Sequence, residues 1–299
     1  MEQSTFIKRL VARSEFGPLV LLVIMVLVFW QINPAFLSAR NIGNMLAFTV
    51  ELGLIALAMT LLMTAGEFDL SVGSLFGFCP VLMWTLYNTE VTSIEVGFAL
   101  ALAAAVAVGL VSGLFVTRLK IPSFLVTLGM LLVVRGTALF VTSGFPQRTW
   151  NASDLALAEI LVGSFKIAGL RLHMSLLWFV VVATALGYVL TQTRIGNWIQ
   201  AAGGNPDAAR ARGVDVDSTK IKLFVLSAVM AGFAGVISSI RTAAANPNSG
   251  TGYELEVIAM VVIGGTALRG GRGTIIGTVL GVFILRLMRN GIVLIGVPG

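Results

Sequence analysis

Charged side chains are scarce in this sequence of 299 residues: they make up 11% of it, whereas hydrophobic residues make up 57%. Soluble domains carry roughly 25% charged residues, so this composition and a mean hydropathy of +0.95 exclude an ordinary soluble domain. No segments alternate as the ~10-residue strands of an outer-membrane barrel do. Several apolar runs reach the ~20 residues that a helix needs to cross a bilayer. We therefore expect an all-α membrane protein, a polytopic helical bundle.

Cysteine and histidine are each present once, as Cys79 and His173. A single cysteine excludes an internal disulfide framework and a multi-cysteine metal site, and a single histidine leaves no histidine-based hydrolytic site to assemble. Cys79 lies in an apolar segment and is expected in the core, whereas His173 heads an apolar run and is expected to be structural. We expect no catalytic residues, no metal and no cofactor, and hence no enzyme.

Long runs of basic residues are also missing, although the formal net charge is +6 and the pI is about 10.0. The longest run is the pair Lys8 and Arg9, so the charge does not indicate nucleic-acid binding. Lys and Arg instead lie at the ends of apolar runs, where they report the orientation of membrane helices. Nine runs are predicted to span the bilayer, at residues 17–37, 46–65, 70–88, 96–117, 122–143, 173–193, 219–241, 254–268 and 273–290.

A cytoplasmic N-terminus agrees with this distribution of basic residues. With a tail of residues 1–16 inside, most Lys and Arg fall in cytoplasmic segments, as the positive-inside rule requires. Loop 144–172 then faces outward. The first apolar run also follows basic residues as a signal peptide does, but it continues without a small-x-small cleavage site, which favours a spanning helix.

An odd number of spans would leave the C-terminus outside. We therefore expect one further apolar helix of roughly 20 residues beyond Gly299, which gives nine to ten helices in a single membrane domain that covers residues 1–299. Within this domain, two segments show the same pattern: an apolar segment ends in a Gly-rich or charged break, and a new helix follows. The breaks are MTAGEFDLSVG at 63–73 and IGGTALRGGRG at 263–273. Interrupted helices in corresponding halves indicate a transporter's substrate path; alternatively, the glycines only allow close helix packing, and both can hold.

A short polar segment, QAAGGNPDAARARGVDVDSTK at 200–220, lies between two long apolar runs. Asn205 suits a helix N-cap, Pro206 the first helical position and Asp207 the positive end of the helix dipole. Gly213 predicts the end of this helix, and the residues between are Ala208, Ala209, Arg210, Ala211 and Arg212. A helix this short is not stable alone, so it must be held by the bundle at the cytoplasmic surface; the alternative is a solvated connecting loop.

Four segments in order carry a resemblance to a known family. They are ALAMTLLMTAGEFDLSVGS from residue 56, IPSFLVTLGMLLVVRGTALF from 121, GGNPDAARARGVDVDSTKIKLFVLSAVMAGFAGVI from 203 and GTGYELEVIAMVVIGGTALRGGRGTIIGTVLG from 250. From about residue 37 to its end the chain resembles the permease subunits of bacterial ribose-type ABC sugar importers. Glu67 departs from that pattern, because the family has glycine there.

The resemblance implies a type II (vitamin B12-type) ABC importer fold with pseudo-repeated halves in the bacterial inner membrane. It also implies three partners: a cytoplasmic ABC ATPase, a periplasmic sugar-binding protein and a second permease copy, identical or not. The ATPase would dock on a cytoplasmic coupling segment, residues 194–220, through Asn205 to Gly213. ATP would be bound by that partner, because this chain has no G-x-x-x-x-G-K-[ST] phosphate loop.

Candidate residues of the translocation path come from the break near residue 67 and from the run 122–143. They are Thr64, Phe68, Asp69, Ser71, Phe124, Thr127 and Arg135. Arg135 lies deep in a spanning segment, where a charge must face a partner or water; an ion pair with Glu51 or Asp69 is favoured over a place in the path.

The leading functional hypothesis is a permease subunit for a monosaccharide or related polyol. The alternative is a secondary transporter or channel that works alone on a small polar solute. A secondary transporter would need ion-coupling carboxylates deep in its helices, and only Glu51 and Asp69 are candidates.

Overall fold

The computed structural model describes residues 15–149, 155–167 and 170–296, so most of the predicted N-terminal tail lies outside the described residues. The long helices are α2 (Phe16–Ile32), α3 (Ala39–Thr64), α4 (Val72–Asn88), α5 (Ile94–Thr117), α6 (Ser123–Thr142), α8 (Met174–Gln192), α11 (Val216–Thr242) and α13 (Ile275–Leu294). The shorter helices are η1 (Pro34–Leu37), α7 (Ala156–Val162), α9 (Arg194–Gly204), α10 (Pro206–Ala211) and α12 (Tyr253–Ile263).

Six of the described helices are long and apolar enough to cross a membrane, namely α3, α5, α6, α8, α11 and α13. The predicted spans 17–37 and 70–88 correspond to α2 and α4, which have 17 residues each. The predicted span 254–268 is shorter than expected, since α12 has 11 residues and at 1.5 Å per residue covers only about half of the ~30 Å hydrocarbon core. Its apolar sequence continues beyond the helix, but the backbone turns at Gly265, whose φ is +93°.

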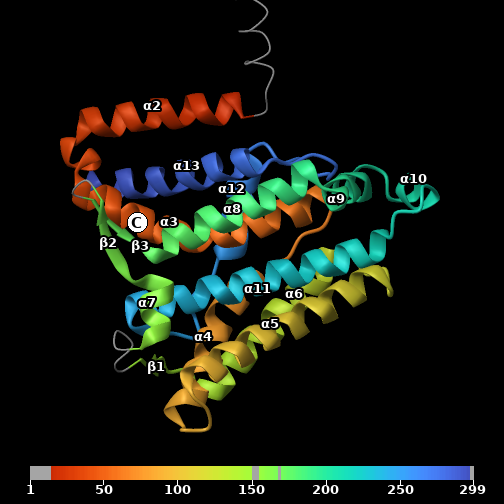
Figure 1. Cartoon of the computed structure of the whole chain (residues 1–299), viewed down its shortest axis with the longest axis horizontal. Helices are drawn as coiled ribbons and strands as arrows, with labels where there is room; N and C mark the ends of the chain where they lie inside the picture. The colour runs from red at the N-terminus through yellow and green to blue at the C-terminus, as the bar shows by residue number, and fades with distance from the viewer. Residues whose placement is uncertain (1–14, 150–154, 168–169, 297–299) are drawn as a thin grey trace, which may run out of the picture.

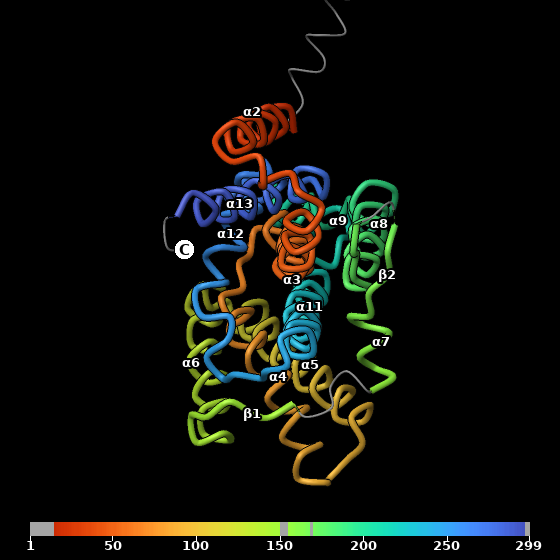
Figure 2. Tube along the Cα trace, turned by 90° about the vertical axis from the view of Figure 1, so that its left-hand side faces the viewer, coloured from red at the N-terminus to blue at the C-terminus, as the bar shows by residue number. Residues whose placement is uncertain are grey.

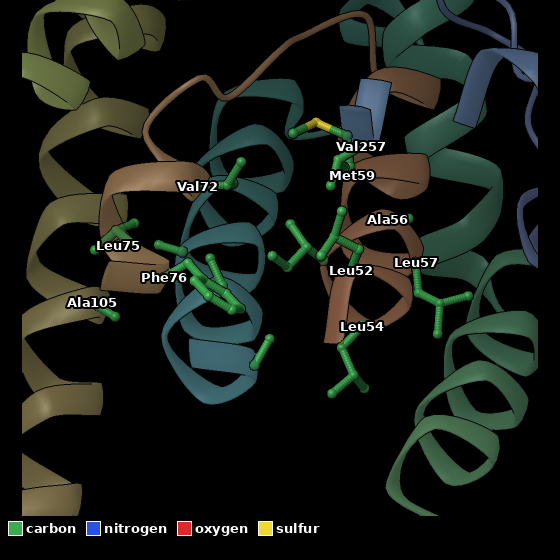
Figure 3. Close-up of a cluster of buried hydrophobic side chains, with 14 of the residues drawn as sticks. Leu52, Leu54, Ala56, Leu57, Met59, Val72, Leu75, Phe76, Ala105 and Val257 are labelled. Atoms are coloured by element: carbon green, nitrogen blue, oxygen red, sulfur yellow. The ribbon is translucent and has the colours of Figure 1, made fainter. Parts of the chain in front are cut away.

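Helices α3 and α11 form the centre of the bundle. The apolar stretch of α3 is 83% buried and that of α11 is 67% buried, against 22% for α6 and 17% for α8. Leu52, Leu57 and Met59 of α3 lie in a core that also takes in Leu75 and Phe76 of α4 (Figure 3). The exposed apolar side chains of the outer helices suit contact with lipid, because a membrane helix needs no polar outer face.

Two short antiparallel ribbons lie at one end of the bundle. β2 (Ser164–Ile167) pairs with β3 (Leu170–His173), and β1 (Gln147–Arg148) pairs with β4 (Ala244–Ala245). We call this end the strand end; α9 and α10 lie at the opposite end, which we call the α10 end (Figure 1). Helix α3 runs between the two, since its Gly43 adjoins the Arg171 backbone of β3 and its Thr64 contacts α9.

A non-helical segment, residues 246–252, connects β4 to α12. It starts at the strand end and leads to the short α12 (Figure 2), which packs against α3, α13 and α4. Gly250 and Gly252 have φ values of +78° and +84°, a conformation that glycine adopts without strain. This segment places irregular backbone between membrane helices, and such backbone is tolerated only where it is buried in protein or lines water.

Candidate functional site

Helix α10 has the end signals that the sequence predicts. The Asn205 side chain accepts a hydrogen bond from the Ala208 N–H at 3.0 Å, and Pro206 opens the helix. Asp207 lies in the first turn, and Gly213, with φ +83°, follows the last turn. The prediction of a short capped helix at this place is confirmed.

The bundle holds α10 through small apolar side chains, as its length requires. Ala209, 4% exposed, packs with Ala202 of α9 and Val216 of α11 in a cluster of their own. Opposite this face, Arg210 pairs with Asp207 at 3.3 Å and with Asp217 at 2.8 Å. The hydrogen bond that Arg210 donates to Asp217 raises the pKa of Arg210 above its usual range. α10 therefore has one face fixed to the bundle and one charged face open to water.

The two predicted helix breaks touch each other, and α9 touches both. The Thr64 carbonyl at the end of α3 accepts a hydrogen bond from the Gly271 N–H at 2.8 Å. A Cβ atom on Gly203 of α9 would overlap the same carbonyl and would lie 2.7 Å from the Gly271 nitrogen. A Cβ on Gly270 would lie 2.9 Å from both the Gly66 Cα and the Gly203 oxygen. We call Gly66, Gly203, Gly270 and Gly271 the glycine junction.

Side chains beside the glycine junction add polar links between the same elements. Thr60 of α3 and Thr278 of α13 share a hydrogen bond at 2.5 Å. Lys220 of α11 pairs with Glu67 at 2.5 Å, and both side chains are 13% exposed. Glu67, the departure from the family pattern, thus joins the first break to the start of α11.

Most of the candidate path residues are buried and make local contacts. Asp69 accepts hydrogen bonds from the Ser71 N–H at 2.9 Å and hydroxyl at 2.6 Å, which stabilises the turn into α4. Thr64 and Thr127 are fully buried, and each donates to the carbonyl four residues earlier in its own helix.

Phe68 and Phe124 are placed differently from these buried residues. The Phe68 N–H donates to the Ser123 hydroxyl at 3.3 Å, which brings the first break to the start of α6. Phe124, next along α6, is 56% exposed. Phe124 is therefore the candidate path residue most open to a solute or to lipid.

Arg135 binds main-chain carbonyls, two of them in the non-helical segment 246–252. Its Nη1 donates to the carbonyls of Pro247 at 2.6 Å and Ser249 at 2.8 Å, and its Nη2 donates to the Gly73 carbonyl at 3.1 Å. The predicted ion pair with Glu51 or Asp69 is wrong, since within the described part of the chain the guanidinium bonds to these carbonyls. Irregular backbone inside a membrane needs such donors.

A polar cavity at the strand end was not predicted from the sequence. It has a volume of about 560 Å³ and lies between α3, α12 and α13. Its lining residues are Asn41, Asn44, Met45, Phe48, Thr49, Glu51, Tyr253, Arg286, Arg289, Asn290, Val293 and Leu294. Polar and charged residues in membrane helices indicate a function, and this signal is present in the sequence as Asn41, Asn44 and Glu51.

Ion pairs and amide bonds join the elements around this strand-end cavity. Glu51 accepts a hydrogen bond at 2.6 Å from Arg241 of α11, and the Arg241 guanidinium lies 4.0 Å from the centre of the Phe48 ring. Asn41 of α3 and Asn290 of α13 exchange amide hydrogen bonds at 2.9 and 3.1 Å. The cavity therefore has walls that both donate and accept hydrogen bonds.

The fold and these contacts define a multi-pass helical membrane protein, with interrupted helices and a capped surface helix at one end. The chain belongs to the family described as the permease component of the branched-chain amino acid transport system, whose model matches residues 41–299. The family is one of transport subunits rather than enzymes, and the chain is a multi-pass protein of the inner membrane.

Curated relatives match over nearly the whole chain. The ribose import permease protein RbsC of Escherichia coli K12 is 36% identical over 284 residues, which cover 95% of this chain and 87% of the relative. The xylose/arabinose import permease protein XylH of Sulfolobus acidocaldarius is 33% identical, over 97% of this chain and 81% of the relative. The L-arabinose ABC transporter permease protein AraH of Azospirillum brasilense is 37% identical, over 89% and 76%. No solved structure matches the chain significantly.

Proposed function

We propose that this chain is the membrane-spanning permease subunit of an ABC importer that carries a monosaccharide or a related polyol into the cell. The names of the relatives support a pentose-like sugar as the substrate class. The observation that carries the proposal is the position of α10, which is fixed to α9 and α11 and, through α9, adjoins both helix breaks. A push on α10 is thereby transmitted to the two places where the membrane helices are interrupted.

The names of the relatives as import permeases of ABC systems support three partners. A cytoplasmic ABC ATPase docks on α10 and its flanks, through Asn205 to Gly213, and binds the ATP that drives transport. A periplasmic sugar-binding protein delivers the solute at the opposite, strand end. A second permease copy, identical or not, completes the path across the bacterial inner membrane in a type II importer-like fold with pseudo-repeated halves. Nucleic acid has no part in this function.

Within this subunit, the path passes the first break and the exposed face of α6. Phe124 is exposed there, and Phe68 adjoins the start of the same helix. Arg135 shapes the path by holding the segment 246–252, and Asp69 with Ser71 fixes the turn into α4. Thr64 and Thr127 contribute by packing, because both are fully buried.

Reconstitution tests the proposal directly. The permease is placed in liposomes with its partner ATPase and binding protein, and uptake of radiolabelled D-ribose, D-xylose and L-arabinose is measured with and without ATP. We expect ATP-dependent uptake of at least one sugar, and none when the ATPase is left out. Uptake driven by an ion gradient without the ATPase would instead show a secondary transporter.

A further inference from the structure

Two membrane helices turn polar faces toward each other at the strand end. On α3, Asn41, Asn44 and Glu51 follow one another at helical spacing, with Phe48 between them. On α13, Arg286, Arg289 and Asn290 form the matching stripe. All of these residues line the strand-end cavity of about 560 Å³. A volume of this size lies within the roughly 300–1,000 Å³ of small-molecule sites.

The charges around the cavity are largely paired within the protein. Glu51 pairs with Arg241 at 2.6 Å, and Glu256 lies 3.6 Å from Arg286 and 3.8 Å from Arg289. Three arginines thus face two carboxylates, and the side chains of Glu51 and Arg286 are only 4% and 11% exposed. Each of these five charged side chains has an opposite charge within 3.8 Å, and one positive charge is in excess. This wall suits a neutral, hydrogen-bonding ligand better than a phosphate or another strong anion, which would need several unpaired cations.

The groups that remain open in the cavity suit hydroxyls and a sugar ring. Asn44 is exposed and makes no hydrogen bond to the described residues, so its amide can both donate and accept. Phe48 is 52% exposed, and Tyr253 adds a second ring to the lining. A polyhydroxylated ring needs both kinds of contact, because its hydroxyls must be paired while its C–H face packs on an apolar or aromatic surface.

We infer that the strand-end cavity is a binding site for a neutral monosaccharide, occupied after the solute is released at this end and before it passes the helix breaks. The inference rests on the proposed function, because sugar import is what supplies such a ligand here. Asn44 is a specificity residue that bonds to the sugar directly. The Asn41–Asn290 amide pair positions α3 against α13 and keeps the cavity open between them.

The first test is the sugar dependence of uptake in the reconstituted system. Asn44→Leu removes the amide at nearly constant volume, and we expect the KM for the transported sugar to rise about fivefold, as the loss of a neutral hydrogen bond implies. The matched control is Met288→Leu on α13, a residue that is 40% exposed and does not line the cavity. An unchanged KM in Asn44→Leu would overturn the inference while leaving the proposed function intact.

The second test needs no transport. In a Cys79→Ser background, the Asn44→Cys variant is treated with a membrane-impermeant thiol reagent in the presence of 0 or saturating D-ribose, D-xylose or L-arabinose. We expect labelling from the strand end, and we expect the transported sugar to slow it at least several-fold. Modification only by a lipid-soluble reagent, or labelling that no sugar slows, would overturn the site. If the wild type shows no ATP-dependent uptake but the sugar still slows labelling, the proposed importer function is refuted and the inferred binding site is retained.

Discussion

Gly203→Ala is the substitution that most directly tests how α10 is connected to the membrane helices. A methyl group at this position would overlap the Thr64 carbonyl and lie 2.7 Å from the Gly271 nitrogen. Both neighbours are main-chain atoms, so neither can move aside by a change of rotamer. The substitution must push α9 away from the two helix breaks.

The size of the effect follows from the cost of overpacking, which is typically about 1–3 kcal/mol. A coupling energy of that size changes an equilibrium roughly 5- to 150-fold. Gly204→Ala is the matched control, because its new Cβ would meet only the Gly271 Cα, at 3.9 Å. Both glycines lie in α9, so the gain in helix propensity is the same for the two variants.

Uptake and ATPase activity are measured on the same proteoliposomes, after the amounts of inserted and assembled complex are matched. We expect Gly203→Ala to lose at least fivefold in uptake per ATP hydrolysed, since the proposed ATPase contact on α10 is kept while the contact of α9 with the two breaks is disturbed. Gly204→Ala should behave as the wild type. Normal uptake in Gly203→Ala, or an equal defect in both variants, would refute the transmission of motion through the glycine junction.

Three further experiments test the proposed role of α10, the contacts of Arg135 and the orientation of the chain in the membrane. Ala209→Pro removes the N–H that donates to the Asn205 carbonyl at 3.0 Å and breaks α10 at a cost of about 3 kcal/mol. We expect this variant to insert into the membrane normally but to lose uptake. Unchanged uptake would contradict the proposed coupling role of α10. Arg135→Met leaves the carbonyls of Pro247, Ser249 and Gly73 without their donor. Since a hydrogen bond from a charged group contributes about 1.5–3 kcal/mol, we expect a melting temperature several degrees lower in detergent. An unaltered melting curve would show that these three hydrogen bonds are not needed for stability. In a Cys79→Ser background, Asn248→Cys should react with an impermeant thiol reagent in intact cells and Ala211→Cys should react only after permeabilisation; the reverse pattern would invert the topology.

The features that could be predicted from the sequence are the ones with local causes. The N-cap at Asn205, the proline that follows it and the stop at Gly213 act within one turn of chain, so they predict α10 correctly. The burial of Cys79 follows from its apolar surroundings in the same way. The contact between the two helix breaks was not predicted, although both breaks were identified from their glycines.

The features that the sequence did not predict depend on distant partners. Arg135 bonds to carbonyls more than 110 residues away at Pro247 and Ser249, and nothing in its own neighbourhood identifies main-chain oxygens as partners. The length of α12 was overestimated because hydropathy measures apolar composition and not the backbone turn at Gly265. The strand-end cavity needs α3 and α13 to face each other, which is a property of the packed bundle.

The glycine junction also bears on the order of events in a transport cycle. A side chain between two helices can change its rotamer and so take up part of a displacement, whereas main-chain contacts cannot. Because α9 meets both breaks through main-chain atoms, a displacement of α9 acts on the two breaks together. We therefore expect the two breaks to move together, so that a state with one break displaced and the other in place is not populated.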